Sequence, residues 1–239
     1  NKINDWKIKF SEITKPNKTT TNPYYVFKKI ADFLKPNTNL YIDTGCSIAW
    51  AMQSMSFSKG QRIYHDFNNT AMGWALPAAI GGFFSNKGKE IVCIAGDGSF
   101  MMSMQELATV YHHKIPIKLI VINNSGYSMI QQTQDQWLAS KYIASSNQGG
   151  LSFPNYSCIA KAYNMEYYVL DKNKNINETL SSFINSSGSS FLNIKIPSDA
   201  RVSPQVKFGR PNEDMEPLLP RKLFMENMIV EPLSVSYND

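Results

Sequence analysis

The chain has 239 residues, a net charge of +5 and a hydrophobic content of 43%. This length and composition predict one large globular domain with its own core and exclude a disordered chain. Its apolar runs are much shorter than the roughly 18 residues that a membrane helix needs. The polar start of the sequence also lacks the apolar segment of a signal peptide. We therefore expect a cytoplasmic protein with no membrane partner.

The cysteines and the charge distribution argue against two further classes. Cys46, Cys93 and Cys158 form no CxxC pair and are odd in number, which disfavours a disulfide framework or a zinc site. The 24 Lys and Arg residues are scattered along the chain. This scatter favours a solvated surface over a nucleic-acid-binding surface, so we expect no nucleic-acid partner.

Helix and strand patterns alternate along most of the chain. Residues 1–22 are polar and predict a linker or arm that enters the domain. Helical spacing follows over 23–35, and a short apolar strand over 39–42 ends at Asp43-Thr44-Gly45. The later patterns predict helices over 72–84, 100–113 and 155–163, and strands over 90–95, 117–122, 167–170 and 191–196.

This alternation predicts an α/β fold, a parallel sheet with helices on both faces, over residues 23–200. Proline-rich sequence over 201–239 predicts an extended C-terminal tail. Ligands of such sheets bind beyond the carboxyl ends of the strands. The loops at 43–47, 96–99 and 123–128 are therefore the candidate functional segments.

The sequence Gly96-Asp97-Gly98-Ser99 follows the strand predicted over 90–95. Glycine permits a sharp turn and close approach to a ligand, and we expect Ser99 to cap the following helix. A helix N-terminus attracts phosphate. A carboxylate beside a phosphate calls for a bridging cation, and Mg2+ accepts oxygen ligands from both groups. The alternative for Asp97 is a solvated side chain in a plain turn.

Asn123 and Asn124 end the next predicted strand, at the same edge of the sheet. One helix and one strand separate them from Asp97, so the two loops are expected to be neighbours. An Asn side-chain oxygen and a backbone carbonyl are suitable additional ligands for Mg2+. Together the two loops predict a site for a metal ion and a phosphate.

These motifs resemble the signature of thiamine diphosphate enzymes, in which GDGS is followed by a helix, a strand and NN. The sequence MGWALPAAIGG from Met72 and QELAT from Gln105 resemble segments of acetolactate synthases. Asp43-Thr44-Gly45 followed by Trp50 resembles their DVGxxxxW loop. The likeness covers residues 23–200 and identifies the chain as similar to the C-terminal diphosphate-binding domain of that family.

The resemblance implies thiamine diphosphate and Mg2+ as cofactors. It implies Asp97, Asn124 and the Gly126 carbonyl as metal ligands. Met72 would support the bent cofactor, for which the alternative is core packing. The residues expected to contact the cofactor are Gly45, Cys46, Ser47, Thr70, Met72, Gly96, Gly98, Ser99, Tyr127 and Met129. Cys46-Ser47 departs from the Gln-His of many family members, which leaves backbone N–H groups as the expected contacts there.

The three histidines are expected to differ in role. His112 and His113 end a predicted helix, where positive charge suits the helix dipole, and a structural role is expected for both. His65 precedes the Met72 loop and is a candidate to face the site, with a structural role as the alternative.

The resemblance also implies partners that this chain does not contain. Enzymes of this type have a pyrimidine-binding domain, in the same or a partner subunit, whose glutamate activates the cofactor. Glu106 belongs to QELAT and is not that glutamate. We expect the chain to be the C-terminal part of a longer protein or, alternatively, a separate subunit, and to be inactive alone. A homodimer or homotetramer is expected, and a middle domain that binds FAD in acetolactate synthases would also lie outside this chain.

The implied activity is that of a carboligase, a transferase that decarboxylates a 2-oxo acid such as pyruvate and adds the two-carbon unit to an acceptor carbonyl. Thr133 stands where acetolactate synthases have the Trp of GMVxQWQ. The hypothesis is therefore an acceptor that is larger or more polar than pyruvate, such as a keto sugar. The alternatives are acetolactate formation with Tyr127 filling the space, a lyase that releases free aldehyde, and a non-catalytic cofactor-binding module.

Overall fold

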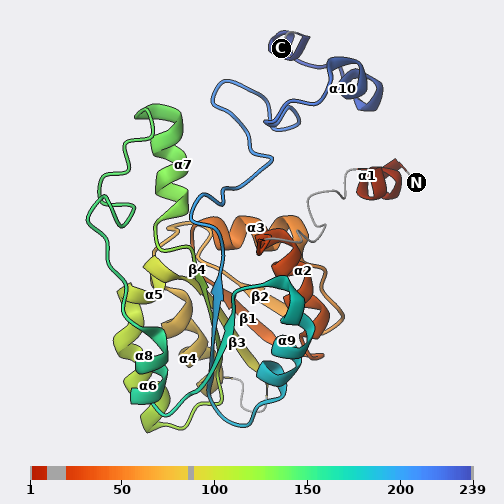
Figure 1. Ribbon diagram of the computed structural model, residues 1–239. Helices are drawn as coiled ribbons and strands as arrows, with labels where there is room; N and C mark the ends of the chain where they lie inside the picture. Colours follow the sequence, from red (N-terminus) through yellow and green to blue (C-terminus); the bar gives the residue numbers. More distant parts are fainter. Residues whose placement is uncertain (1, 10–19, 86–88, 238–239) are drawn as a thin grey trace. The chain divides into compact units, whose positions relative to one another are not determined.

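The structure is a computed structural model that describes residues 2–9, 20–85 and 89–237. In this described part of the chain, six parallel strands form one sheet in the order β2-β1-β3-β4-β6-β5 (Figure 1). The strands are β1 (Asn39–Ile42), β2 (Arg62–Tyr64), β3 (Ile91–Gly96), β4 (Lys118–Asn123), β5 (Glu166–Leu170) and β6 (Ser190–Lys195). The predicted α/β fold with a parallel sheet is confirmed.

Helices cover both faces of this sheet (Figure 1). One face carries α2 (Pro23–Phe33), α3 (Cys46–Ser54) and α9 (Ile176–Asn185). The other face carries α4 (Ala75–Ser85), α5 (Asp97–Ser103), α6 (Leu107–His112) and α8 (Tyr156–Ala162). Strands β3 and β4 are buried along almost their whole length. Their nearly continuous apolar sequence is the one expected for strands that are covered on both faces.

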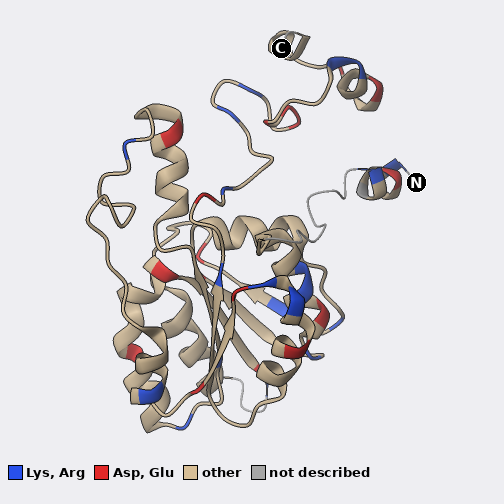
Figure 2. Ribbon diagram, in the orientation of Figure 1, with Lys and Arg blue, Asp and Glu red and all other residues tan. Residues whose placement is uncertain are grey.

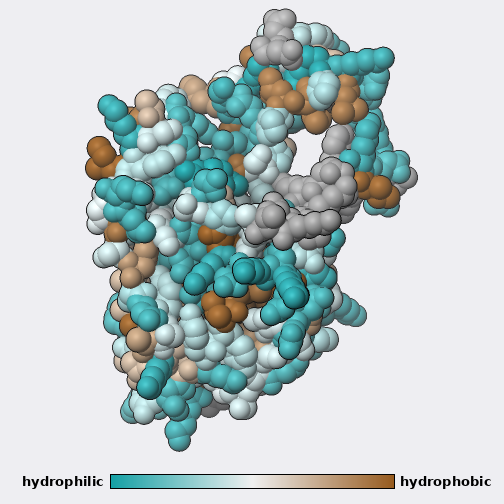
Figure 3. All heavy atoms as spheres, viewed as in Figure 1, coloured by the Kyte–Doolittle hydropathy of each residue, from teal (hydrophilic) through white to brown (hydrophobic). Residues whose placement is uncertain are grey.

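Helix α2 shows how one helix serves both the core and the surface. Val26, Phe27 and Ile30 are fully buried. Its outer side carries Lys29 and Asp32, whose Nζ and Oδ2 atoms form an ion pair at 3.2 Å. Figure 2 shows charges of both signs on this helix layer, and Figure 3 shows that hydrophilic residues dominate the same face of the molecule. The apolar stripe of α2 therefore packs on the sheet while its charged side faces solvent.

Several elements differ from the sequence prediction. Helices α3, α7 (Ser128–Trp137) and α9 and strand β2 were not predicted. The helix predicted over 100–113 is divided into α5, a 3-10 turn (Met104–Glu106) and α6. The division occurs at Ser103, whose φ of −135° and ψ of 12° leave the α region.

The described chain divides into two compact units, Asn1–Ala200 and Arg201–Asp239. The predicted linker over 1–22 contains a helix, α1 (Lys2–Lys9), in which the Lys2 amine lies over the Trp6 ring; residues 10–19 are outside the described residues. Within the described ranges, every helix is too short or too polar to cross a membrane.

The C-terminal unit also differs from the extended tail that the prolines predict, because it contains α10 (Arg221–Asn227). The buried Asp214 carboxylate pairs with Arg210 at 3.0 Å and with Arg221 at 3.0 Å. The Arg221 guanidinium also donates to the Ser236 carbonyl at 3.1 Å. These charge-assisted hydrogen bonds join distant parts of the segment into a compact unit.

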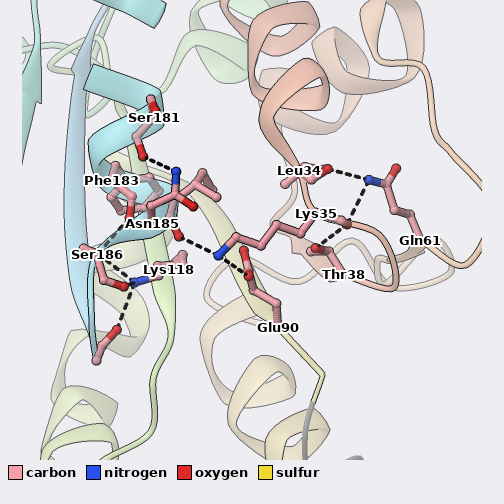
Figure 4. A network of polar contacts seen from close by, with 12 residues as sticks. Leu34, Lys35, Thr38, Gln61, Glu90, Lys118, Ser181, Phe183, Asn185 and Ser186 are labelled. Atoms are coloured by element: carbon pink, nitrogen blue, oxygen red, sulfur yellow. Dashed lines mark hydrogen bonds and ion pairs between the residues drawn. The ribbon is translucent and has the colours of Figure 1, made fainter. Parts of the chain in front are cut away.

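The amines of Lys35 and Lys118 form hydrogen bonds and an ion pair at the amino edge of the sheet (Figure 4). The Lys118 amine, at the start of β4, donates to the Ser186 carbonyl and hydroxyl, both at 2.7 Å, and to the Gly188 carbonyl at 3.0 Å. The Lys35 amine pairs with Glu90 at 3.0 Å and donates to the Ile184 carbonyl at 3.2 Å. These bonds tie the segment after α2, the start of β3 and the α9–β6 turn together.

We predict that Lys118→Met lowers the free energy of unfolding of this chain by about 2 kcal/mol, because the carbonyl groups of Ser186 and Gly188 lose their charged donor, the amine of the buried Lys118. The matched control is Lys161→Met on the exposed side of α8, which should change stability by less than about 0.5 kcal/mol. Thermal and urea unfolding of both variants measure the difference. Equal effects would show that the Lys118 hydrogen bonds do not contribute to stability.

Candidate functional site

A cavity of about 300 Å3 lies at the carboxyl ends of β1, β3 and β4. The strand order places β2 on one side of β1 and β3 on the other, so successive connections leave this point in opposite directions. Such a switch point is where open α/β sheets bind their ligands. The cavity is therefore at the position that the topology favours for a ligand.

The structure brings the sequence-predicted cofactor and metal residues together around this one cavity. The predicted residues that line it are Gly45, Cys46, Ser47, Thr70, Met72, Gly96, Asp97, Gly98, Ser99, Asn124, Gly126, Tyr127 and Met129. Thr133 does not line it. The Thr133 side chain is on the exposed side of α7, and its hydroxyl donates to the Met129 carbonyl at 3.2 Å.

Two of the predicted loops prove to be helix N-termini. Gly45 is the N-cap of α3 and has a φ of 96°, a left-handed conformation that favours glycine. Gly96 is the N-cap of α5. The prediction that Ser99 caps this helix is wrong, because Ser99 lies inside α5 and its side chain bonds to Asp43. N–H groups in the first turn of a helix have no intrahelical acceptor, so both ends can serve an anion in the cavity.

Asp97 is a buried carboxylate at the start of α5, with 1% of its surface exposed. Its Oδ1 accepts a hydrogen bond from the Gly98 N–H at 2.8 Å, and its Oδ2 accepts one from the Gly126 N–H at 3.2 Å. Burial raises the pKa of the Asp97 carboxyl to about 7, against the opposing effect of these backbone donors. No Lys or Arg is among the described residues that line the cavity. A buried carboxylate without a basic partner is suited to a metal cation.

The two asparagines at the end of β4 have different roles. The Asn123 amide nitrogen donates to Asn193 on β6 at 3.2 Å, and its oxygen accepts the Ser125 N–H at 3.1 Å. Asn123 therefore shapes the turn. The Asn124 amide nitrogen donates to the Ser128 hydroxyl at 2.7 Å, which leaves Oδ1 as the amide atom able to serve as a ligand.

The ligand chemistry around the cavity fits Mg2+ better than a softer metal. Asp97, Asn124 and the Gly126 carbonyl are all oxygen donors, as Mg2+ prefers. Over residues 2–9, 20–85 and 89–237 there is no cluster of three or more His, Cys, Asp or Glu side chains of the kind that holds zinc. The residues present therefore fit a diphosphate that is bridged to the protein by Mg2+.

Close packing at Gly98 sets one wall of the cavity. A Cβ atom at this position would lie 2.2 Å from Tyr127 Cε1 and 3.3 Å from Met72 Cε. Only glycine therefore lets the Tyr127 ring approach the first turn of α5. Met72 is partly exposed and lies on the same wall, where a bound molecule would contact its flexible thioether.

Asp43 is a residue whose importance the sequence reasoning missed. Its carboxylate is buried and accepts the N–H groups of Thr44 at 2.9 Å, Gly73 at 3.1 Å and Ala75 at 2.9 Å. Burial raises the pKa of the Asp43 carboxyl, and these donors together with the Ser99 hydroxyl oppose the rise. The Ala75 contact caps α4 from another element, so that helix begins at residue 75 rather than at the predicted 72. An acid directly after a buried strand was the available signal.

The fold and the cavity define an α/β domain that holds a phosphate-bearing cofactor at the switch point of a parallel sheet. Residues 43–194 match the family described as the thiamine pyrophosphate enzyme, C-terminal TPP binding domain. The match covers more than half of the chain, so the chain belongs to this family. The predicted cofactor, thiamine diphosphate, is thereby supported.

The chain is also similar to acetolactate synthases. It is 28% identical over 214 residues to the large subunit of Pyropia yezoensis, an alignment that covers 90% of this chain and 36% of that protein. Identity is 27% over 197 residues to acetolactate synthase 1, chloroplastic, of Zea mays, covering 81% and 31%. It is 27% over 192 residues to the isozyme 1 large subunit of Escherichia coli (strain K12), covering 80% and 34%. The chain thus spans about a third of the length of these relatives.

We predict that Gly98→Ala weakens thiamine diphosphate binding by the full-length protein about tenfold, because the new methyl group displaces the Tyr127 ring, which lines the cavity. Gly81→Ala in α4 is the matched control, since its Cβ would meet nothing within 4 Å. Titration of cofactor into both variants, followed by calorimetry, measures the difference. Unchanged affinity in Gly98→Ala would mean that the cofactor does not depend on this wall.

Proposed function

We propose that the protein is a thiamine diphosphate-dependent carboligase of the acetolactate synthase type. It would decarboxylate a 2-oxo acid, with pyruvate as the first candidate, and transfer the two-carbon unit to an acceptor carbonyl. The observation that carries this proposal is the cavity lined by the family's motif residues, in a chain that is similar to acetolactate synthases. When bound, thiamine diphosphate supplies an electron sink for the decarboxylation.

This chain would hold the diphosphate through Mg2+ and two helix N-termini. Asp97, Asn124 and the Gly126 carbonyl are the proposed metal ligands. Support comes from the burial of Asp97 without a basic partner and from the Asn124–Ser128 bond that orients the amide. The N-termini of α3 and α5, at Gly45–Ser47 and Gly98–Ser99, would bind the phosphate oxygens through backbone N–H groups. Because these contacts are to the backbone, Cys46 and Ser47 can stand where relatives have other side chains.

Met72 and Thr70 would contact the remainder of the cofactor. Met72 lies between two residues in left-handed conformations, Thr70 with a φ of 50° and Gly73 with a φ of 84°. The Asp43 carboxylate holds the Gly73 N–H, so the loop is anchored next to Met72. A residue fixed in this way is suited to supporting a bent ligand, which is the role that we propose for the Met72 side chain.

The complete activity needs groups that we propose to lie outside this chain. A pyrimidine-binding domain, in the same or a partner subunit, would supply the activating glutamate, in a homodimer or homotetramer. The proposal rests on the fraction of the relatives that this chain spans. FAD in a further domain, and a cytoplasmic location, belong to the same proposal. This chain alone would bind cofactor weakly and would show no turnover.

For the acceptor we propose a ketone that is larger or more polar than pyruvate, such as a keto sugar. Thr133 lies one helical turn after Met129 on α7, and Met129 lines the cofactor cavity. Thr133 is small and exposed, and although it lines neither this cavity nor the adjoining one, its position next to Met129 is what the acceptor proposal rests on. A second cavity, which adjoins the first, offers further room.

The metal role predicts that Asp97→Ala raises the Kd for thiamine diphosphate in the presence of Mg2+ by about 100-fold, the size expected when one partner of a buried charge pair is lost. Asp32→Ala on the exposed side of α2 should leave the Kd unchanged. Both are measured in the full-length protein with Mg2+ and again with EDTA. Wild-type cofactor retention that is equal with and without EDTA would refute the metal role.

The acceptor hypothesis predicts that the full-length enzyme, supplied with pyruvate and a saturating keto sugar, forms more sugar adduct than acetolactate. Thr133→Trp should shift the products toward acetolactate, because a large aromatic side chain closes the space beside Met129. Product analysis by mass spectrometry provides the ratio. Dominant acetolactate from the wild type would contradict the acceptor hypothesis, and free acetaldehyde alone would identify a decarboxylase instead.

A further inference from the structure

A second cavity of about 330 Å3 adjoins the cofactor cavity. Thr44, Gly45, Thr70 and Met129 line both cavities. The second cavity has four further lining residues that do not line the first, Ile48, Ala49, Met52 and His65. Its volume is at the lower end of the range for small-molecule sites, about 300–1,000 Å3. A molecule in the second cavity would therefore lie directly beside one in the first.

The two sides of this second cavity differ in chemistry. Helix α3 contributes an apolar wall of Ile48, Ala49 and Met52. His65 and Thr70, which bracket the turn before Met72, contribute polar groups. Among its described lining residues, His65 is the only one with a titratable side chain. A ligand with one apolar side and several hydroxyl groups matches this arrangement.

His65 is held in place by three contacts. Its Nδ1 lies 2.9 Å from the Ile42 carbonyl oxygen at the end of β1. The ring meets Phe67 and Trp74 edge to face, with centroids 4.7 and 6.4 Å apart. A carbonyl oxygen only accepts hydrogen bonds, so Nδ1 carries the proton and Nε2 of the neutral ring is the acceptor. The ring orientation is therefore fixed, and Nε2 is the ring nitrogen that remains to accept a hydrogen bond from a ligand hydroxyl.

The loop that carries His65 is itself held by local hydrogen bonds. The Asp66 carboxylate accepts the N–H groups of Asn69 at 3.3 Å and Ala71 at 3.4 Å. The Asp66 carbonyl accepts the Thr70 N–H at 2.8 Å. The polar wall is thus positioned before any ligand binds, which lowers the entropic cost of binding.

We infer that the second cavity is the acceptor subsite and that His65 selects a hydroxylated ketone by accepting a hydrogen bond from one of its hydroxyl groups through Nε2. This inference rests on the proposed carboligase function and specifies its acceptor. An acceptor without hydroxyl groups forms no hydrogen bond with Nε2. When such an acceptor covers Nε2, that atom is left without a hydrogen-bond partner, which costs free energy of binding. His65 therefore discriminates between acceptors and leaves the decarboxylation of the donor unaffected.

The test compares dihydroxyacetone, the smallest keto sugar, with acetone, which has the same carbon skeleton without hydroxyl groups. His65→Asn retains an amide near the position of Nδ1 and removes Nε2, and His65→Gln restores a polar group near the position of Nε2. Asn68→Ala, an exposed residue of the same loop, is the matched control. The full-length enzyme is loaded with thiamine diphosphate, Mg2+ and pyruvate. Carboligation and ferricyanide-coupled decarboxylation are both measured.

We expect His65→Asn to lower kcat/KM for dihydroxyacetone about tenfold relative to acetone, with decarboxylation unchanged and with recovery in His65→Gln. Saturation-transfer NMR with glycerol, an unreactive analogue, should show weaker binding to His65→Asn than to the wild type or Asn68→Ala. Equal losses for the two ketones, or no loss for either, would overturn the role of His65. A wild type that decarboxylates pyruvate and forms neither ketone adduct nor acetolactate would instead overturn the proposed carboligase function, and the inference with it. Acetolactate without either ketone adduct would overturn the inference alone.

Discussion

The carboxylate of Asp43 joins the segments on which the site depends. It accepts hydrogen bonds from the end of β1, from the Met72 loop at Gly73 and from the first turn of α4 at Ala75. The Ser99 hydroxyl adds the first turn of α5. A buried carboxylate requires such donors, since water cannot reach it. Its burial therefore fixes the relative positions of Met72 and the α5 N-terminus, and with them the shape of the cavity.

The neighbouring carboxylate, Asp97, is buried to the same degree and also accepts backbone N–H groups. Asp97 lines the cavity whereas Asp43 does not, and this difference in position is why we propose a structural role for Asp43 and a metal-binding role for Asp97. A third buried charged group, the Lys118 amine, lies at the opposite edge of the sheet. It donates hydrogen bonds to carbonyl and hydroxyl oxygens of the α9–β6 turn (Figure 4). The amino edge is thus held by hydrogen bonds between elements, whereas loops and helix N-termini form the cavity at the carboxyl edge.

The sequence was sufficient to predict the parallel sheet, because β3 and β4 are nearly continuous apolar runs. It also placed Asp97 and Asn124 at one edge, since both follow these strands directly. Long-range contacts were not predictable in the same way. The start of α4 depends on Asp43, more than 30 residues earlier in the chain. The break at Ser103 changes which side of the following helix is buried, so that Val110 is buried while Tyr111 is 58% exposed. The exposed position of Thr133 likewise depends on α7, a helix that has no clear apolar periodicity and was not predicted.

We propose that the cavity at the carboxyl ends of β1, β3 and β4 holds the diphosphate through a metal ion. A crystal structure of the full-length protein with thiamine diphosphate and Mg2+ tests this claim. We expect the metal at about 2.0–2.1 Å from oxygens of Asp97, Asn124 and Gly126, with the phosphates against the first turns of α3 and α5. A diphosphate bound elsewhere, or bound in this cavity with the Asp97 carboxylate out of reach of the metal, would contradict the claim.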